Sequence, residues 1–223
     1  FNDVDSISKC IQLGAQDYLP KPINGTILLA KVVAALERKL RREREKELVK
    51  KLHIQATTDQ LTGIYNRRVI FEALDEAMEN SKQSKDRQFA TIMFDIDFFK
   101  QVNDNYGHAG GDAVLVSFAQ LLQTEISSPN IVGRIGGEEF LAILYLSPDE
   151  AKEFCVKLIH KINNNLVDFE GTEIKISSSG GVAFSTETET SADLTNKADE
   201  RLYEAKKNGR NRFTLHDSEL VGE

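Results

Sequence analysis

The sequence predicts an α/β (α+β) fold in which helices flank a mixed five-stranded sheet. Two observations lead to this prediction. From residue 57 onward, segments with helical and strand-like patterns follow one another in the order α β α β β α β α β. Two of the strand-like segments are separated by a short turn containing Gly-Gly, so they must form an antiparallel hairpin, whereas the helical crossovers permit parallel neighbours.

The bulk properties describe a globular protein with enough apolar residues for a core. Of the 223 residues, 40% are hydrophobic and 28% are charged, and the net charge is -7. This negative charge argues against a nucleic-acid partner. No stretch approaches the ~20 apolar residues of a membrane span, and the start shows no signal-peptide pattern. We therefore expect a cytoplasmic location.

Residues 1–36 have the pattern of a short helix near Ile7 and Ile11, a short strand at residues 17–19, a turn and a second helix from Ile27. Such a set cannot close a core alone. The segment 14–22, Gly-Ala-Gln-Asp-Tyr-Leu-Pro-Lys-Pro, is similar to the last strand and Lys-Pro turn of a response-regulator receiver domain. A generic strand-turn-helix is the alternative.

The receiver resemblance implies that Lys21 matches the lysine that contacts a phosphorylated aspartate in that family. The aspartate itself, and most of the receiver fold, are missing from the sequence. We therefore expect residues 1–36 to be the C-terminal fragment of a receiver domain that cannot accept phosphate. The cognate histidine kinase would act on the missing portion.

Residues 37–56 predict a helical stalk, because nearly every residue from Glu37 to Lys51 is charged and neither glycine nor proline interrupts the segment. Apolar residues recur at helical spacing, although Arg44 interrupts the stripe. Short two-helix packing and a solvated spacer helix are both compatible with this pattern. The apolar residues of the stripe are Val33, Leu36, Leu40, Leu48 and Leu52.

A new domain begins at Thr57. The capping and turn residues 58–63 precede a helix expected to run to about Asn80, and a polar connection leads to an apolar strand at residues 89–94. This strand ends in Asp95 and Asp97. Carboxylates at the carboxyl end of a buried strand occupy the position where ligand chemistry usually lies in α/β sheets.

Residues 103–112 are rich in turn formers, so we expect a loop there, followed by a helix over residues 113–126. The hairpin then pairs residues 131–135 with residues 140–146, and its turn needs positive φ at Gly136 and Gly137. Two acids, Glu138 and Glu139, follow the turn directly. Their mutual repulsion suggests a cation site, although a solvated acidic turn is equally compatible with these residues alone.

The remaining elements complete the sheet. We expect a helix over residues 151–164, a strand over residues 174–184 that is broken by the Gly180-Gly181 pair, and a helix over residues 193–207 ended by Gly209. A last strand covers residues 212–215. Residues 217–223 are expected to be a tail.

Residues 57–216 closely resemble the GGDEF family of diguanylate cyclases, in its GGEEF variant. Five ordered blocks carry the resemblance, which leaves little room for coincidence. It implies a palm-like sheet shared with class III nucleotide cyclases, and a nucleotidyltransferase reaction that joins two GTP into cyclic di-GMP with release of two pyrophosphates. The blocks are residues 59–68 (DQLTGIYNRR), 94–100 (FDIDFFK), 103–108 (NDNYGH), 136–140 (GGEEF) and 198–211, in which residues 198–199 (AD) and 202–211 (LYEAKKNGRN) match.

The resemblance also implies a metal site. Its ligands would be Asp95, Glu138 and the carbonyl oxygen of Ile96. The cation would be Mg²⁺, or Mn²⁺ in its place, because magnesium takes oxygen ligands and few protein carboxylates. Glu138 would also be the base on the ribose 3′-hydroxyl. Because neighbouring strand residues point to opposite faces and do not easily share one ion, only one of the two glutamates is expected as a main ligand. Glu139 would be a second metal or catalytic residue.

Further positions match the family's substrate contacts. Asn103 and Asp112 would bind guanine, because a carboxylate accepts from the base N1–H and amine and rejects adenine. The triphosphate contacts would come from Lys100, Lys206 and Arg210. The resemblance also implies that Phe99 contacts the substrate. Without the motif, each lysine would be an ordinary surface charge.

The sequence departs from the family in one place. Members inhibited by their own product carry Arg-x-x-Asp, separated by five residues from the Gly-Gly pair, and here residues 127–130 read Ser-Ser-Pro-Asn. We therefore expect no high-affinity product inhibition there. Because one protomer holds one GTP, catalysis requires a homodimer. The alternative is a weakly active or inactive GTP-binding or scaffolding module.

Overall fold

The computed structural model describes residues 8–9, 12–15, 17–19, 21–84, 88–216 and 220–222. The chain divides into two compact units, residues 1–54 and 55–223. The helices are α2 (Gly25–Thr57), α3 (Arg67–Gln83), α4 (Phe99–Glu125), α5 (Pro148–Asn163) and α6 (Ser191–Lys207). The strands are β1 (Ala90–Ile96), β2 (Ile131–Arg134), β3 (Glu139–Leu144), β4 (Leu166–Phe169), β5 (Thr172–Lys175), β6 (Ser178–Phe184), β7 (Arg212–Thr214) and β8 (Leu220–Gly222).

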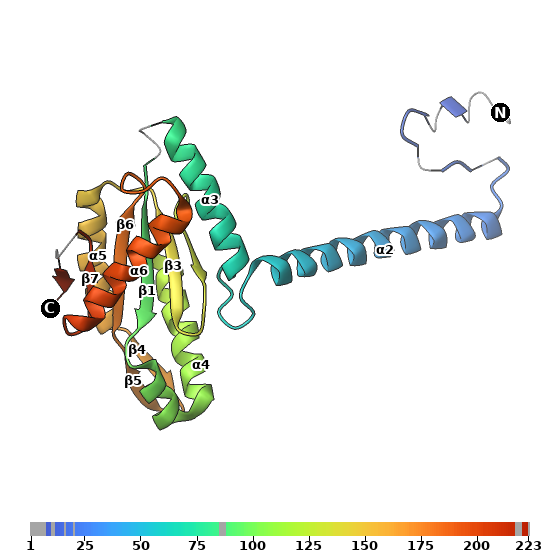
Figure 1. The fold of residues 1–223 in the computed structure, drawn as a ribbon. Coiled ribbons are helices and arrows are strands. Elements are labelled where there is room, and N and C mark those ends of the chain that lie inside the picture. Colours follow the sequence, from blue (N-terminus) through green and yellow to red (C-terminus); the bar gives the residue numbers. More distant parts are fainter. Residues whose placement is uncertain are drawn as a thin grey trace. The chain divides into compact units, whose positions relative to one another are not determined.

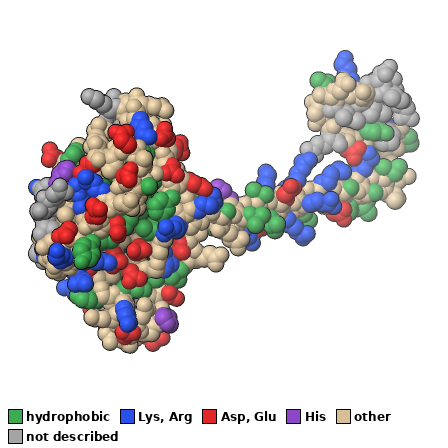
Figure 2. All heavy atoms as spheres, in the orientation of Figure 1, with side chains coloured by type: hydrophobic (Ala, Val, Ile, Leu, Met, Phe, Trp, Pro, Cys, Tyr) green, Lys and Arg blue, Asp and Glu red, His purple; other side chains and the backbone are tan. Residues whose placement is uncertain are grey.

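The first unit consists mainly of α2, one unbroken helix of 33 residues whose end, residues 55–57, is already part of the second unit. Its start is capped by the Asn24 side chain, which accepts from the backbone N–H groups of Thr26 and Ile27. Apolar side chains along it stay exposed between charged ones, as Figure 2 shows; Leu36 is 55% exposed. The predicted boundary between residues 36 and 37 does not coincide with any break in the helix.

The predicted strand at residues 17–19 does not form, because no neighbouring strand is present in the described part of this unit to pair with it. Instead Asp17 forms an ion pair with Lys31 of α2, and the Lys31 ammonium lies 4.8 Å from the centre of the Tyr18 ring. Of the predicted helix near Ile7 and Ile11, those two residues lie outside the described ones, but the described residues Ser8, Lys9 and Gln12 are helical.

The second unit contains a mixed sheet with the strand order β2-β3-β1-β6-β7-β8. The β6–β7 pair is parallel, whereas the other neighbours are antiparallel. The mixed sheet was predicted, but the described residues contain six strands in it rather than five. The addition is β8, three residues in the segment expected to be a tail, which pairs with the free edge of β7 and is too short to give a periodic signal.

Helices cover both faces of this sheet, as the ribbon in Figure 1 shows. α3 and α6 pack on one face, over a core that contains Met93 of β1 and Leu141 of β3. α4 and α5 pack on the other, where Phe94 and Phe140 alternate with those residues. Helices α3, α5 and α6 begin with side-chain caps from Asn66, Ser147 and Thr190, which explains their sharp starts.

The Gly180-Gly181 pair does not break a strand, as the sequence analysis expected, but lies within β6. The interruption falls at residues 176–177, between β5 and β6. A Cβ atom on Gly181 would lie 1.9 Å from the Ala198 carbonyl oxygen of α6, and one on Gly180 would lie 2.1 Å from the Phe213 ring. Glycine is therefore required by the close approach of α6 and β7, not by a turn.

Two further predictions differ from the structure. The expected loop at residues 103–112 is helical, because α4 already begins at Phe99 and continues through a kink at Gly107, where φ is 70°. The turn-forming residues of this segment therefore mark a kink and not a loop. In addition, β4 and β5 form a separate two-stranded hairpin that the sequence analysis did not predict, because its two strands have only four residues each.

Candidate active site

The acidic turn and the end of β1 meet at one edge of the main sheet. β1 and β3 run antiparallel, and their register places Asp95 opposite Glu139. Residues directly opposite each other point to the same face of a sheet. These two carboxylates therefore extend the face that α3 and α6 cover, just beyond Met93 and Leu141. The register thus brings together the acids that the sequence analysis singled out.

Arginine side chains hold the turn that carries the two glutamates. Arg134 donates to the carbonyl oxygen of Gly136 at 3.2 Å and to that of Gly137 at 3.1 and 2.7 Å. Arg67 donates to the carbonyl oxygen of Ile135 at 2.8 Å. These bonds fix the backbone immediately before the first glutamate.

The prediction that Gly136 and Gly137 take positive φ is wrong. The connection between β2 and β3 spans residues 135–138 rather than two residues, so it does not need the left-handed conformation of a tight hairpin. The Glu139 side chain lies close to Gly136, but its flexible end could move aside, so space alone does not require glycine there. A Cβ atom there would lie 2.5 Å from a carboxylate oxygen of Glu139.

The chain just after α2 anchors this turn. A carboxylate oxygen of Asp59 accepts from a guanidinium nitrogen of Arg134 at 3.1 Å, and from the backbone N–H and the hydroxyl of Thr62 at 2.9 and 2.6 Å. Burial opposes ionisation of Asp59, but the bonds from Thr62 and Arg134 outweigh it, so the pKa is lowered. The first residues of the second unit thus reach the acidic turn through one ion pair.

Asp95 is only 7% exposed, and its carboxylate lies 2.8 Å from the ammonium of Lys206 on α6. Burial raises the pKa of Asp95, and the nearby Asp97 raises it further, whereas Lys206 and Arg210 act in the opposite direction. An ionised Asp95 therefore depends on nearby positive charge. In this structure Lys206 supplies it.

Glu138 lies half-buried beside Asp95. Burial is the main cause that raises the pKa of Glu138, and repulsion by the Asp95 carboxylate adds to it. The carbonyl oxygen of Glu138 accepts from the N–H of Ile96 at 3.3 Å, which ties the turn to the end of β1. Two partly buried carboxylates that repel each other form an arrangement that a divalent cation stabilises.

The alternation argument does not separate the two glutamates. β3 begins at Glu139, so Glu138 belongs to the turn and the two-residue period of a strand does not apply to it. Glu139 is the glutamate whose register matches Asp95. Its carboxylate folds back toward Gly136.

The predicted guanine-binding residues lie on α4, on either side of the kink at Gly107. A Cβ atom on Gly111 would lie 2.0 Å from the side-chain oxygen of Asn103. The Asn103 amide therefore packs directly against the backbone beside Asp112, whose own side chain is exposed. The kink brings together two residues that are nine positions apart in the sequence.

The remaining predicted contacts lie at the start of α4 and the end of α6. Lys100 is exposed, but Phe99 is a core residue, only 9% exposed, so its side chain offers little surface to a ligand. The exposed aromatic residue is Phe98, at 53%. The guanidinium of Arg210 lies 4.7 Å from the centre of the Phe98 ring.

Comparison with known families identifies this arrangement. The family described as "Diguanylate cyclase, GGDEF domain" matches residues 56–212, which include every side chain placed above. The chain belongs to the GGDEF family. Its second unit, residues 55–223, is thus a GGDEF domain with a short extension at the end.

Curated proteins similar to this GGDEF chain include Diguanylate cyclase A of Treponema denticola, 34% identical over 168 residues, which are 74% of this chain and 45% of that protein. Response regulator PleD of Caulobacter vibrioides is 33% identical over 217 residues, which are 94% of this chain and 47% of that protein. The chain spans about half the length of the curated relatives that it matches.

Solved structures share the fold. The coiled coil and GGDEF domain of DgcB from Caulobacter crescentus, in complex with c-di-GMP, has a TM-score of 0.71 and 26% identity over 85% of this chain and 99% of that chain. Diguanylate cyclase SiaD of Pseudomonas aeruginosa, in complex with its activator SiaC, has a TM-score of 0.69 and 29% identity over 96% of this chain and 83% of that chain. These structures confirm the predicted class, a mixed α+β fold whose sheet is flanked by helices.

The sequence analysis missed the residues of the GGDEF domain that hold the site rather than form it. Arg134 was treated only as the start of the hairpin, and Asp59 and Arg67 only as parts of a motif. A signal existed for Arg134, which lies between Gly133 and the Gly136-Gly137 pair, whose carbonyl oxygens need donors. The pairing of Asp59 with Arg134 spans 75 positions, so no local pattern shows it.

Among the described residues, no group of three or more His, Cys, Asp or Glu side chains is arranged to hold a metal. Asp95 and Glu138 are two such residues, and a cation there would need its other ligands from backbone, substrate or water. None of the helices built from the described residues combines the length and the apolarity that a membrane crossing requires.

Proposed function

We propose that this GGDEF domain, in its GGEEF variant, is an active diguanylate cyclase that condenses two GTP into cyclic di-GMP and two pyrophosphates. The observation that carries the proposal is the cluster of Asp95, Glu138 and Lys206 at one sheet edge. A carboxylate pair beside a lysine suits a site that must hold both a cation and a triphosphate.

Asp95, Glu138 and the backbone carbonyl of Ile96 would hold Mg²⁺, or Mn²⁺ in its place. When bound, the cation lowers the pKa of the attacking hydroxyl and neutralises charge on the pyrophosphate leaving group. The donor set fits such an ion, because all three groups are oxygen ligands and two are neighbouring carboxylates. Burial, and then repulsion by the Asp95 carboxylate, raises the pKa of Glu138.

Each of the two condensations forms one bond from a ribose 3′-oxygen to the α-phosphorus of the other GTP and breaks the bond from that phosphorus to the β-phosphate oxygen. Glu138 takes the 3′-hydroxyl proton as a general base. Glu139 assists beside it. Lys206, Lys100 and Arg210 bind the triphosphate.

Asn103 and Asp112 would select guanine. The Asp112 carboxylate accepts from the N1–H and the exocyclic amine, and adenine has no N1–H donor to offer it. Phe99 supports this subsite from the core, because its ring packs close to the backbone of Gly111. The exposed position of Asp112 leaves its carboxylate accessible to a base.

We further propose the domain boundaries and partners that follow from this activity. Residues 1–36 are the end of a receiver domain, 37–56 a stalk, 57–216 the cyclase domain and 217–223 a tail. Two protomers face each other, each with one GTP, and exposed apolar residues of α2 hold them together. A histidine kinase would act on the receiver. The protein would work in the cytoplasm, because its substrate GTP is found there.

One incubation tests the activity. The chain is mixed with GTP and Mg²⁺, and the products are separated by chromatography. We expect cyclic di-GMP and pyrophosphate in a ratio of one to two. If a dimeric form of the chain binds GTP but gives no cyclic product, the chain is a GTP-binding or scaffolding module and the proposed activity is refuted.

A further inference from the structure

The carboxylate directly after β1, that of Asp97, does not join the acidic site but is enclosed by hydrogen-bond donors. It is only 4% exposed. One carboxylate oxygen accepts from the Ser179 hydroxyl at 2.7 Å. The other accepts from the Ser177 hydroxyl at 2.8 Å and from the backbone N–H of Asn211 at 3.0 Å. Asp97 therefore ties the end of β1 to the loop between α6 and β7.

That loop has an unusual backbone. Arg210 and Asn211 both have positive φ, 62° and 50°, which L residues rarely adopt. Successive left-handed residues persist only where surrounding bonds enforce them. Two bonds do so here: the N–H of Arg210 donates to the Ala205 carbonyl at 3.1 Å, and the N–H of Asn211 donates to Asp97.

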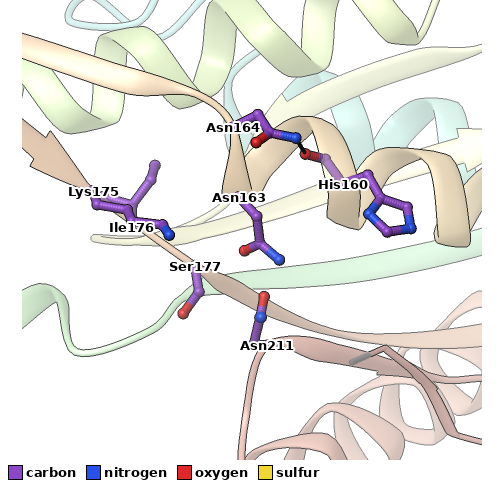
Figure 3. A pocket seen from close by; sticks show the side chains of 7 residues that line it. All are labelled: His160, Asn163, Asn164, Lys175, Ile176, Ser177 and Asn211. Carbon is purple, nitrogen blue, oxygen red and sulfur yellow. Dashed lines mark hydrogen bonds between the residues drawn. The ribbon is translucent and has the colours of Figure 1, made fainter.

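The loop delivers one side chain to the candidate active site. The guanidinium of Arg210 lies 4.7 Å from the centre of the exposed Phe98 ring, at the start of α4. The Asn211 side chain points away from the candidate active site. It points toward Asn163 in a polar pocket that Ser177 also lines (Figure 3). The bond to Asp97 thus uses the backbone of the loop and leaves both side chains free for other contacts.

We propose that Asp97 is a positioning residue that, through the backbone N–H of Asn211, holds Arg210 in the place where it meets the triphosphate of GTP. The inference rests on the proposed function for the identity of the ligand. The claim that Asp97 fixes the loop is independent of the proposed function, because it follows from the hydrogen bonds of Asp97.

The first test examines the loop directly. Hydrogen exchange of residues 208–213 is measured by mass spectrometry in the full chain and in Asp97→Ala. We expect faster exchange of this segment in the variant, with unchanged exchange in β1 and β3. Equal exchange of the loop in both proteins would overturn the proposal. Asp97→Ser, whose hydroxyl is too short to reach Asn211, replaces Asp97→Ala if the latter does not fold.

The second test measures binding of 3′-deoxy-GTP, which lacks the attacking hydroxyl and cannot react. Its Kd is determined by calorimetry for the wild type, Asp97→Ala, Arg210→Ala and the double variant. A lost hydrogen bond between charged groups weakens binding ~10-fold or more, so we expect that effect in each single variant. Because Asp97 acts through Arg210, the double variant should bind no more weakly than Arg210→Ala.

Two controls separate positioning from general destabilisation. Ser179→Ala removes one bond to Asp97 but not the bond to Asn211, so it should lower stability and leave the Kd within ~2-fold. Asp97→Asn keeps an oxygen for the Asn211 N–H, and should stay within ~3-fold of the wild type.

Three binding results would overturn the proposal. The first is a double variant whose loss of affinity equals the product of the two single losses, and the second is a wild-type Kd in Asp97→Ala. The third is a Kd in Ser179→Ala that rises as much as the Kd in Asp97→Ala. The second result would mean that the Phe98 ring alone places Arg210. Wild-type binding of 3′-deoxy-GTP without formation of cyclic product from GTP would refute the proposed activity but not this inference.

Discussion

The ammonium of Lys206 on α6 lies 2.8 Å from a carboxylate oxygen of Asp95 at the end of β1. The pair joins a residue predicted to hold a cation with one predicted to hold a triphosphate. Without a cation, Lys206 compensates the buried charge of Asp95. A cation on Asp95 would take over that role and leave Lys206 to contact phosphate oxygens.

The pair predicts the behaviour of Asp95→Asn. The amide keeps the shape of the side chain and an oxygen for Lys206 but is a poor ligand for Mg²⁺, so formation of cyclic di-GMP should fall by at least ~100-fold. The melting temperature should not fall, because a buried charge is removed. Activity and thermal unfolding are measured together.

The matched control is Glu76→Gln, which removes an exposed carboxylate on α3 and should change neither activity nor melting temperature. Retention of wild-type activity by Asp95→Asn would refute the metal assignment. Loss of activity together with a large drop in melting temperature would show a structural role instead.

The approach of α6 to β6 gives a second prediction. A Cβ atom on Gly181 would lie 1.9 Å from the Ala198 carbonyl oxygen and 2.4 Å from the Leu202 nitrogen, both backbone atoms that cannot rotate away. Gly181→Ala should therefore cost ~3 kcal/mol of unfolding free energy. Because α6 also carries Lys206, the variant should lose activity even where it remains folded. Urea unfolding and product formation are measured together.

Gly137→Ala is the control for stability, since a Cβ atom there would have no atom within 4 Å and its φ is not positive. It should unfold within ~0.5 kcal/mol of the wild type. An equal loss in the two variants would contradict the steric explanation.

How much of this could be predicted from the sequence depends on the range of the interactions involved. The β1 strand, the hairpin of β2 and β3, and helices α3, α5 and α6 have clear local signals, namely apolar periods and caps such as Ser147. The grouping of Asp95 with the acidic turn followed from motif resemblance. What the sequence did not show was set by tertiary contact.

Four residues illustrate that limit. Gly107 and Gly111 indicate a loop by composition, but packing of α4 against the sheet keeps the segment helical on both sides of a kink. Gly180 indicates a turn, yet it makes room for the ring of Phe213. Asp97 resembles a second acid of the site, but its partners Ser177 and Asn211 lie 80 and 114 positions away.

Asp112 should control the choice of base. Inosine triphosphate retains the N1–H of GTP but lacks the exocyclic amine, so the wild type should prefer GTP by ~10-fold or more. Asp112→Asn replaces one acceptor oxygen with a donor, and should reduce this preference to within ~3-fold while weakening GTP itself. Competition between the two nucleotides for binding measures the ratio. An unchanged ratio would move the guanine contact elsewhere.

The segment before the acidic turn predicts the response to product. Asn130 accepts from the backbone N–H of Tyr145 at 2.8 Å, so its amide serves the local fold, and residues 127–130 include neither a guanidinium nor a carboxylate. Calorimetric titration with cyclic di-GMP should therefore show no sub-micromolar site. If such a site appears and Asn130→Ala leaves it unchanged, the ligand binds elsewhere; if Asn130→Ala abolishes it, this prediction is wrong.

Arg201 and Glu187 form a buried clasp between α6 and the loop after β6. Two guanidinium nitrogens of Arg201 donate to the two carboxylate oxygens of Glu187 at 2.7 Å, and one also donates to the Val182 carbonyl at 2.8 Å. Arg201→Met leaves Glu187 with Lys197, 3.6 Å away, and the N–H of Phe184, and should cost ~1–3 kcal/mol of unfolding free energy. Lys157→Ala, which breaks an exposed pair with Glu153, should cost under ~1 kcal/mol.

The pair of Arg201 and Glu187 also makes the free energy of unfolding depend on pH. Burial disfavours the charge of Glu187, but bonds from Arg201 and from the backbone N–H of Phe184 outweigh it and lower the pKa of Glu187 below its ordinary 4.5. A lowered folded-state pKa contributes stability that is present above the unfolded pKa and is lost as the pH falls through the folded one. The stability difference between wild type and Glu187→Gln should therefore be largest near pH 7 and shrink below pH ~4.5.

A double variant separates the coupling of the pair from the cost of burying each residue. Arg201→Met with Glu187→Met removes both charges at once, so it should be less destabilised than the sum of the two single variants. Urea unfolding at pH 7 measures all four proteins. Strict additivity, or a stability difference for Glu187→Gln that does not change between pH 7 and pH 4, would show that the two side chains do not act as a pair.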